Sequence, residues 1–210
     1  EEVAQSARLN DNVKPGDIKY VDISGPDGVP DGKISPEYDR VLLGGSLPRF
    51  MYGGVFSGGY NGLDLSVTVQ GIGKQLVRTD KMFNPYPQSW GNFPENLEGK
   101  YWSMLNSEEE NLNASYPRLT RTGVNNNQIL SDFWLINGAY LRLKNIAISY
   151  TYSIPEAVSK KIGINRVRAY VSGSDLFSID QYPAGWDPEL GGLSSYPITR
   201  SFVMGISVNL

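Results

Sequence analysis

The sequence predicts an all-β fold, an antiparallel segment of a transmembrane β-barrel, from two observations. Apolar and polar residues alternate along several stretches, and the segments that join these stretches alternate between short and long. The first pattern is clearest in residues 199–210. On one face of this predicted strand lie Phe202, Met204, Ile206, Val208 and Leu210. The chain then stops without a polar tail, as the last strand of such a barrel does, so we expect this strand to direct membrane insertion.

Four earlier stretches are also predicted as strands. They are residues 50–60, 63–76, 134–152 and 166–179. Asn61-Gly62, between the first two, is the strongest short signal for a hairpin. In the second stretch the leucines and valines share one face, and we expect its polar residues to face the barrel lumen or a plug. These polar residues are Asp64, Ser66, Thr68 and Gln70. The alternation in residues 134–152 changes phase, which a bulge near Lys144-Asn145 would repair.

The segments between the strands predict an orientation. Residues 1–49 are a turn-rich loop region with a possible short strand at 17–23, and residues 77–133 and 180–197 are long loops. A helix is possible at 95–106, and a single helical turn at 155–158. Transmembrane barrels have short periplasmic turns and long extracellular loops. If the last strand ends at the periplasm, both long loops are extracellular and both short connections are periplasmic.

Composition excludes several classes of protein. No apolar run is long enough for a transmembrane helix. The chain has no Cys and no His, which removes disulfides, thiolate and imidazole zinc sites, and Ser-His or Cys-His catalysis. A net charge of −3 without a basic block argues against a nucleic-acid partner. Since no carboxylate pair is singled out for hydrolysis, we predict no enzymatic activity and no catalytic residues.

A series of short motifs runs along nearly the whole chain. They are PGDIKY at 15–20, DRVLLG at 39–44, PRFMYG at 48–53, GLDLSV at 62–67, NASYPRL at 113–119, SDFWLINGAYLRLKN at 131–145, RAYVSG at 168–173 and WDPE at 186–189. In order and spacing they resemble the C-terminal part of SusC/RagA-family outer-membrane proteins, the TonB-dependent transporters of the Bacteroidetes.

The resemblance implies a barrel of about 22 strands with an N-terminal plug, in the outer membrane of a Gram-negative bacterium of the Bacteroidetes type. It implies uptake of glycans (as oligosaccharides) or peptides, with a SusD-like surface lipoprotein as lid and with energy from TonB. Residues 50–210 would supply about five C-terminal strands, so we expect a C-terminal fragment or a separate chain of a cleaved transporter. The remainder of the barrel, its plug and the TonB-contacting segment would lie outside this chain. Family members commonly end in an aromatic residue, and Leu210 departs from this pattern in a way that bears on insertion efficiency.

Three kinds of site are predicted. In the outer loops we expect contact with substrate or with the lipoprotein through Trp90, Tyr101, Trp102 and Trp186, with packing inside the loops as the alternative. Aromatic girdles at the membrane surfaces fit Tyr52, Phe56, Tyr60, Tyr150 and Tyr152. The acidic turn at 22–34 resembles a calcium loop with ligands Asp22, Asp27 and Asp31, although Pro26 occupies a ligand position. A tight turn without metal is the alternative, so the predicted cofactor is either none or calcium.

Two alternatives to the barrel explain part of the pattern. A soluble β-sandwich could bind carbohydrate through Trp90, Trp102 and Trp186, and a glycoside hydrolase fragment could use an unidentified carboxylate. The sandwich accounts for the alternation but not for the two-sided loop lengths. It also requires a second sheet over the apolar face, including Leu65, Val67, Ile206 and Val208.

Overall fold

The computed structural model describes residues 2–80, 95–119, 125–190, 196 and 198–210. The chain divides into two compact units. A loop unit comprises Glu1–Gly44 and Arg78–Leu135, and a sheet unit comprises Gly45–Val77 and Ile136–Leu210. No helix among the described ranges combines the length and the hydrophobicity that crossing a bilayer requires.

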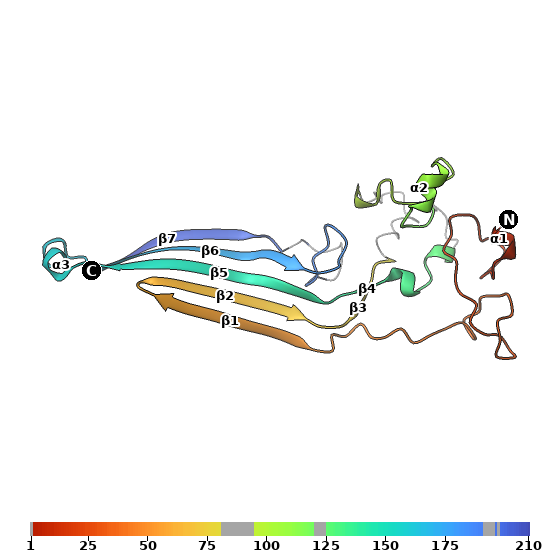
Figure 1. Ribbon diagram of the computed structural model, residues 1–210, viewed down its shortest axis with the longest axis horizontal. Coiled ribbons are helices and arrows are strands. Elements are labelled where there is room, and N and C mark those ends of the chain that lie inside the picture. The colour runs from red at the N-terminus through yellow and green to blue at the C-terminus, as the bar shows by residue number, and fades with distance from the viewer. Residues whose placement is uncertain (1, 81–94, 120–124, 191–195, 197) are drawn as a thin grey trace. The chain divides into compact units, whose positions relative to one another are not determined.

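The sheet unit is built on one antiparallel sheet of five strands, in the order β1-β2-β5-β6-β7 (Figure 1). The strands are β1 (Met51–Tyr60), β2 (Leu63–Ile72), β5 (Tyr140–Ser153), β6 (Arg166–Ile179) and β7 (Ser201–Asn209). A separate pair consists of β3 (Leu76–Arg78) and β4 (Leu135–Asn137). Strands β1 and β7 each pair on one side only, so within the described residues the sheet is open at both edges.

The alternation of residues predicted these strands to within a few residues. The two longer predictions are divided, because 63–76 becomes β2 and β3 and 134–152 becomes β4 and β5. The bulge near Lys144-Asn145 is confirmed: the pairing of β2 with β5 shifts between Thr68 and Val69, where Thr68 faces Asn145 and Val69 faces Leu143. Lys144 is therefore the extra residue that restores the apolar phase.

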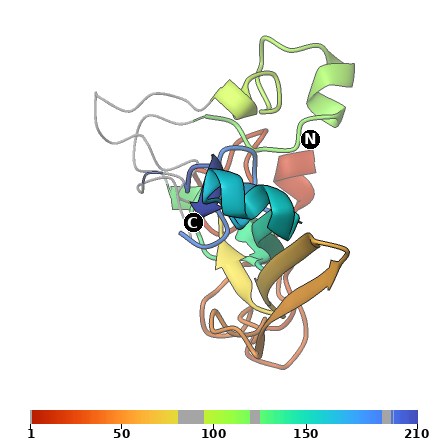
Figure 2. The same cartoon turned by 90° about the vertical axis from the view of Figure 1, so that its left-hand side faces the viewer.

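Both short connections lie at the same end of the sheet, which we call the short-turn end. Asn61 and Gly62 join β1 to β2 with positive φ angles of 50° and 84°, as a tight hairpin turn requires. Leu63 pairs with Tyr150, so the segment after β5 leaves at this same end. That segment holds α3 (Glu156–Ile162), which Figure 2 shows beside the C-terminus. The opposite end, from which the long segments leave, is called the long-loop end.

The loop unit has little regular structure. It contains α1 (Glu2–Gln5), α2 (Glu108–Leu112) and 3₁₀ turns at Glu95–Leu97, Asn125–Asn127 and Asp132–Trp134. The helix predicted at 95–106 is wrong, since only its first turn forms. The helix that does form, α2, starts at Glu108, just beyond the predicted range, because Ser107 and Glu110 make a capping box. The short strand predicted at 17–23 does not form either.

Candidate functional site

One face of the sheet is apolar across all five strands, and it is exposed. The register places Phe56 opposite Val67 and Val67 opposite Ile146. Leu65 is 44% exposed and Ile206 is 74% exposed. A soluble sandwich would bury this face under a second sheet, so the described residues do not form the predicted sandwich alternative. We call this exposed apolar face of the sheet the outward face.

Aromatic side chains on the outward face gather toward its ends. The register places Tyr60, Tyr150 and Tyr152 at the short-turn end and Tyr52 at the long-loop end, with Phe56 between them. Tyrosine has an apolar ring and a polar hydroxyl, so it suits the boundary between lipid tails and water. The positions of the tyrosines agree with the girdles expected from the sequence.

The opposite face of the sheet is polar, and we call it the polar face. The four residues predicted to face the lumen all lie on it: Asp64, Ser66, Thr68 and Gln70. Hydrogen bonds run across the strands here. Arg168 Nη2 donates to Ser149 Oγ at 2.9 Å, and Ser149 Oγ donates to Asp64 Oδ2 at 3.5 Å. The structure thus brings the predicted lumen residues together on a hydrophilic wall, and their facing a lumen stays a prediction.

Five charged side chains form a cluster at the long-loop end of the polar face, which we call the ionic cluster. Its members are Arg142, Lys144, Asp175, Asp187 and Glu189. Arg142 Nη2 lies 2.7 Å from Asp187 Oδ1, and Arg142 Nε lies 3.4 Å from Glu189 Oε1. Lys144 Nζ lies 2.6 Å from Asp175 Oδ1. The Arg142 side chain is only 7% exposed, so these charges interact with little screening by water.

The geometry of the cluster follows from two irregular backbone positions. Lys144 is the bulged residue of β5, and Asp175 lies in the matching shift of β6 with a φ of 52°. Burial raises the pKa of Asp187, but the Arg142 guanidinium and the Glu189 N–H outweigh it and hold that pKa below its usual value. The cluster was not predicted from the sequence. The change of phase at Lys144-Asn145 and the WDPE motif were its only visible signals, and neither reveals a long-range ion pair.

The aromatic residues predicted to contact substrate or the lipoprotein lie in different units. Tyr101 and Trp102 are half-buried in the loop unit, and Trp186 lies in the sheet unit and is only 8% exposed. Trp90 lies outside the described residues. The ring of Trp102 covers Gly16, where an added Cβ would come within 2.3 Å of the ring. Trp102 and Trp186 therefore pack in their own surroundings, as the self-packing alternative expects, and contact with a ligand stays a prediction.

The loop unit is organised around the buried carboxylate of Asp17, whose side chain is 0% exposed. Arg118 binds it through Nε at 2.6 Å and Nη2 at 3.2 Å, and the side-chain amides of Asn126 and Asn127 donate to it. Burial raises the pKa of Asp17, but these donors and the Lys14 N–H lower it by more than burial raises it, so the pKa lies below the usual value of 3.8. The PGDIKY motif thus ties the start of the chain to residues 100–135.

Tyr20 closes the same network. Its hydroxyl donates to the Asn126 carbonyl oxygen at 2.5 Å. Burial and the charge of Asp17 raise the pKa of Tyr20 to about 12, so the hydroxyl keeps its proton and remains a donor. The sequence showed the motif but not its partners, which lie about 100 residues away along the chain.

The acidic turn uses its carboxylates to hold its own backbone. Asp22 Oδ2 accepts from the Gly32 N–H at 2.6 Å, and Asp31 Oδ1 accepts from the Lys33 N–H at 3.0 Å. Asp39 bonds three further backbone N–H groups, those of Ile23, Ser24 and Ser35. In the described part of the chain no three acidic side chains gather closely enough to hold a metal. Calcium binding by Asp22, Asp27 and Asp31 stays a prediction, and this arrangement agrees with the tight-turn alternative.

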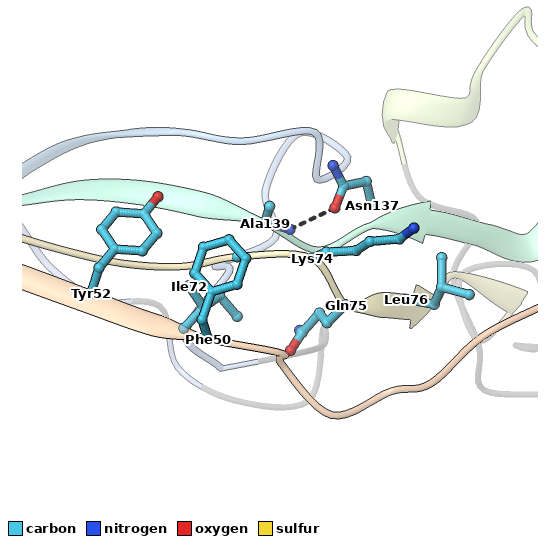
Figure 3. A pocket seen from close by; sticks show the side chains of 9 residues that line it. Phe50, Tyr52, Ile72, Lys74, Gln75, Leu76, Asn137 and Ala139 are labelled. Atoms are coloured by element: carbon cyan, nitrogen blue, oxygen red, sulfur yellow. Dashed lines mark hydrogen bonds between the residues drawn. The ribbon is translucent and has the colours of Figure 1, made fainter.

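A groove of about 490 Å³ opens at the long-loop end of the sheet (Figure 3). Phe50 and Tyr52 line it, with ring centroids 6.1 Å apart, and the Tyr52 hydroxyl donates to the Tyr140 carbonyl oxygen at 3.0 Å. On its far side the Ala139 N–H donates to Asn137 Oδ1 at 3.1 Å. Tyr52 lies on the outward face and Ile72 lies on the face of Gln70, so residues of both faces line the groove at this end of the sheet.

The predicted insertion strand is β7 with the residue that follows it. Met204 and Ile206 are more than 70% exposed on the outward face, and Val203 is the one large apolar side chain that β7 places on the polar face. The other members of the outward row are Phe202, Val208 and Leu210. A role for this strand in insertion stays a prediction.

Comparisons with known proteins agree with this geometry. No protein-family model matches the chain. TonB-dependent receptor P3 of Formosa agariphila is 28% identical over 223 residues, covering 97% of this chain and 20% of that receptor. TonB-dependent receptor P26 of the same organism is 26% identical over 223 residues, covering 99% of this chain and 21% of the receptor. The chain is related to TonB-dependent receptors.

Solved structures of a transporter of the SusC/RagA type share the fold. The RagAB peptide importer in its open-open state matches with a TM-score of 0.63 at 20% identity, over 93% of this chain and 21% of that one. The RagAB peptide transporter matches with a TM-score of 0.60 at 22% identity, over 92% of this chain and 20% of that one. The open sheet therefore has the fold of part of such a barrel. The chain spans about a fifth of the length of the TonB-dependent receptors that it matches.

Proposed function

We propose that this chain supplies part of the wall and the outer loops of an outer-membrane importer driven by TonB. The observation that carries the proposal is the exposed apolar outward face on a sheet that is open at both edges. In a bilayer such a face meets hydrocarbon, whereas unpaired strand edges are not tolerated there. Strands β1 and β7 therefore pair with the remainder of the same barrel. A Bacteroidetes-type outer membrane is the proposed location, since both relatives come from Formosa agariphila.

The mechanism we propose is transport without chemical change to the cargo. Substrate enters at the long-loop end, passes along the polar face and leaves when TonB remodels a plug held inside the barrel. Asp64, Ser66, Thr68 and Gln70 would line that route or meet the plug. The cargo is a peptide or an oligosaccharide. One structural neighbour is a peptide importer, and the half-buried Tyr101 and Trp102 can stack on either kind of cargo.

We also infer a SusD-like lipoprotein partner on the outer side. The loop unit exposes Met104, Leu105 and Leu112 almost fully. Large apolar side chains exposed together mark contact surfaces, and methionine and leucine adapt well to a partner. A glutamate at position 105 or 112 would reduce co-purification of the lipoprotein with the receptor. Retention of the partner at the normal level in a Leu105→Glu, Leu112→Glu double variant would contradict this inference.

The proposed function is tested by deleting the gene that encodes the receptor containing this chain. We expect loss of uptake of a fluorescent oligopeptide or oligosaccharide, restored by the complete receptor and not by a receptor lacking its TonB-contacting segment. The protein is expected in the outer-membrane fraction. Normal uptake of every peptide and glycan offered, or recovery of the receptor in the soluble fraction, would contradict the proposal.

A further inference from the structure

The segment after β6 turns back onto the polar face of the sheet. Arg142 faces Gln70 on one neighbouring strand and Ser178 on the other, so it belongs to the polar face. Asp187 and Glu189, which follow β6 along the chain, reach Arg142 at 2.7 and 3.4 Å. Residues 182–190 therefore lie over the polar face at its long-loop end, and do not simply continue away from the strands.

Arg142 is the centre of the contacts that hold this segment. It approaches all three acids of the ionic cluster, including Asp175 at 3.8 Å. Lys144 bridges two of these acids, at 2.6 Å from Asp175 and 3.3 Å from Glu189. Without the guanidinium, three carboxylates, none more than 17% exposed, would share one ammonium group. Their mutual repulsion and the loss of solvation would then favour opening of the segment.

Two hydrogen bonds within the segment brace it internally. Asp187 Oδ1 also accepts from the Glu189 N–H at 2.9 Å, and the Trp186 N–H donates to the Pro183 carbonyl oxygen at 3.0 Å. The Trp186 ring is buried beside the cluster. Buried packing of this kind favours two discrete positions, closed or released, over a gradual displacement.

We propose that Arg142 is a latch that holds residues 182–190 against the inside of the barrel wall, where this segment narrows the outer mouth of the lumen. The latch itself rests on the contacts above, and only its location in a lumen rests on the proposed function. With the latch closed, the residues at the mouth then include Trp186 and its neighbours. Residues 180–197 were predicted as an extracellular loop, and the proposal adds that residues 182–190 of this loop turn back toward the barrel wall.

The latch can be tested in the complete receptor by measuring a distance. The chain contains no Cys, so spin labels at Ser57→Cys on the polar face of β1 and at Leu190→Cys in the segment can be the only labels, in a background free of other cysteines. We expect one narrow distance distribution in the parent protein. Arg142→Met should broaden it toward longer distances and speed amide exchange in residues 182–190 by at least about tenfold. Gln70→Met, a control facing Arg142 across the strand pair, should leave both measurements unchanged.

Several outcomes would overturn the latch. Unchanged distances and exchange in Arg142→Met would do so, as would exchange that rises equally in β1 and β2, because that would mean a general loss of stability. If Arg142→Met does not assemble, Glu189→Gln in the same assay should give a smaller change in the same direction, and no change would again refute it. Failure of the parent receptor to import any cargo would instead count against the proposed function alone.

Discussion

The assignment of the two faces predicts opposite outcomes for arginine at neighbouring positions of β5. Ile148 lies on the outward face in a row with Leu65, Val171 and Met204, and it is 49% exposed. In the complete receptor, Ile148→Arg would place a charge in the hydrocarbon. Ala147→Arg would place the same side chain on the polar face, where Ala147 lies between Ser66 and Ser172.

The expected difference is large. An arginine facing lipid near the middle of a barrel strand destabilises the barrel by about 2–4 kcal/mol, whereas a substitution on the lumen side has little effect. At about 1.4 kcal/mol per factor of ten, Ile148→Arg should lower the folding equilibrium roughly 30- to 700-fold. Ala147→Arg should change stability by no more than about 0.5 kcal/mol.

The assay is urea unfolding of the receptor in lipid vesicles, read as the shift in mobility between folded and unfolded protein on a gel. The amount of folded receptor in the outer membrane serves as a second readout. Equal stability of the two variants, or a larger loss for Ala147→Arg, would refute the assignment of the outward face to lipid.

Three further predictions concern the loops and turns. Arg118→Met should leave the buried Asp17 carboxylate without its cation and destabilise the loop unit by about 3–5 kcal/mol, seen as faster proteolysis. Lys19→Met removes only the exposed ion pair with Glu2 and should change the stability of the loop unit by less than about 1 kcal/mol. The pKa of Asp17 lies below its usual 3.8, so the stability that ionised Asp17 contributes to the loop unit is complete above pH 3.8 and is lost as the pH falls through the lowered pKa. Proteolysis should therefore accelerate below about pH 4, and Asp17→Asn should remove this dependence on pH. Gly62→Ala should weaken the first hairpin more than Gly163→Ala weakens the end of α3, because a Cβ at Gly62 meets a carbonyl oxygen at 2.4 Å while a Cβ at Gly163 meets nothing; equal amide exchange at the two sites would contradict this.

The strands could be predicted because their physics is local. Alternation along β2 and β7 records which face meets water and which does not, and a two-residue turn such as Asn61-Gly62 carries its own conformational signature. The phase change at Lys144-Asn145 revealed even the bulge. What alternation could not provide was the division of residues 134–152 into β4 and β5, since both parts contain residues suited to strands.

The loop unit and the ionic cluster could not be predicted because their partners are distant in the sequence. Asp17 pairs with Arg118, and Arg142 pairs with Asp187, but a single sequence does not reveal which charges meet. The helix expected at 95–106 failed for a local reason. The capping box of Ser107 and Glu110 places the helix start later, and this signal was visible in the sequence.

The unpaired edges of β1 and β7 have a consequence for protein engineering. Strands join their neighbours through main-chain hydrogen bonds, which are largely indifferent to side-chain identity. A block running from β1 to β7 could therefore be exchanged between related receptors, with its loops, if the apolar bands of donor and recipient lie at matching heights. Such chimaeras would transplant the outer surface of one receptor onto the pore of another. Produced alone in water, the same block would offer two adhesive edges and should aggregate.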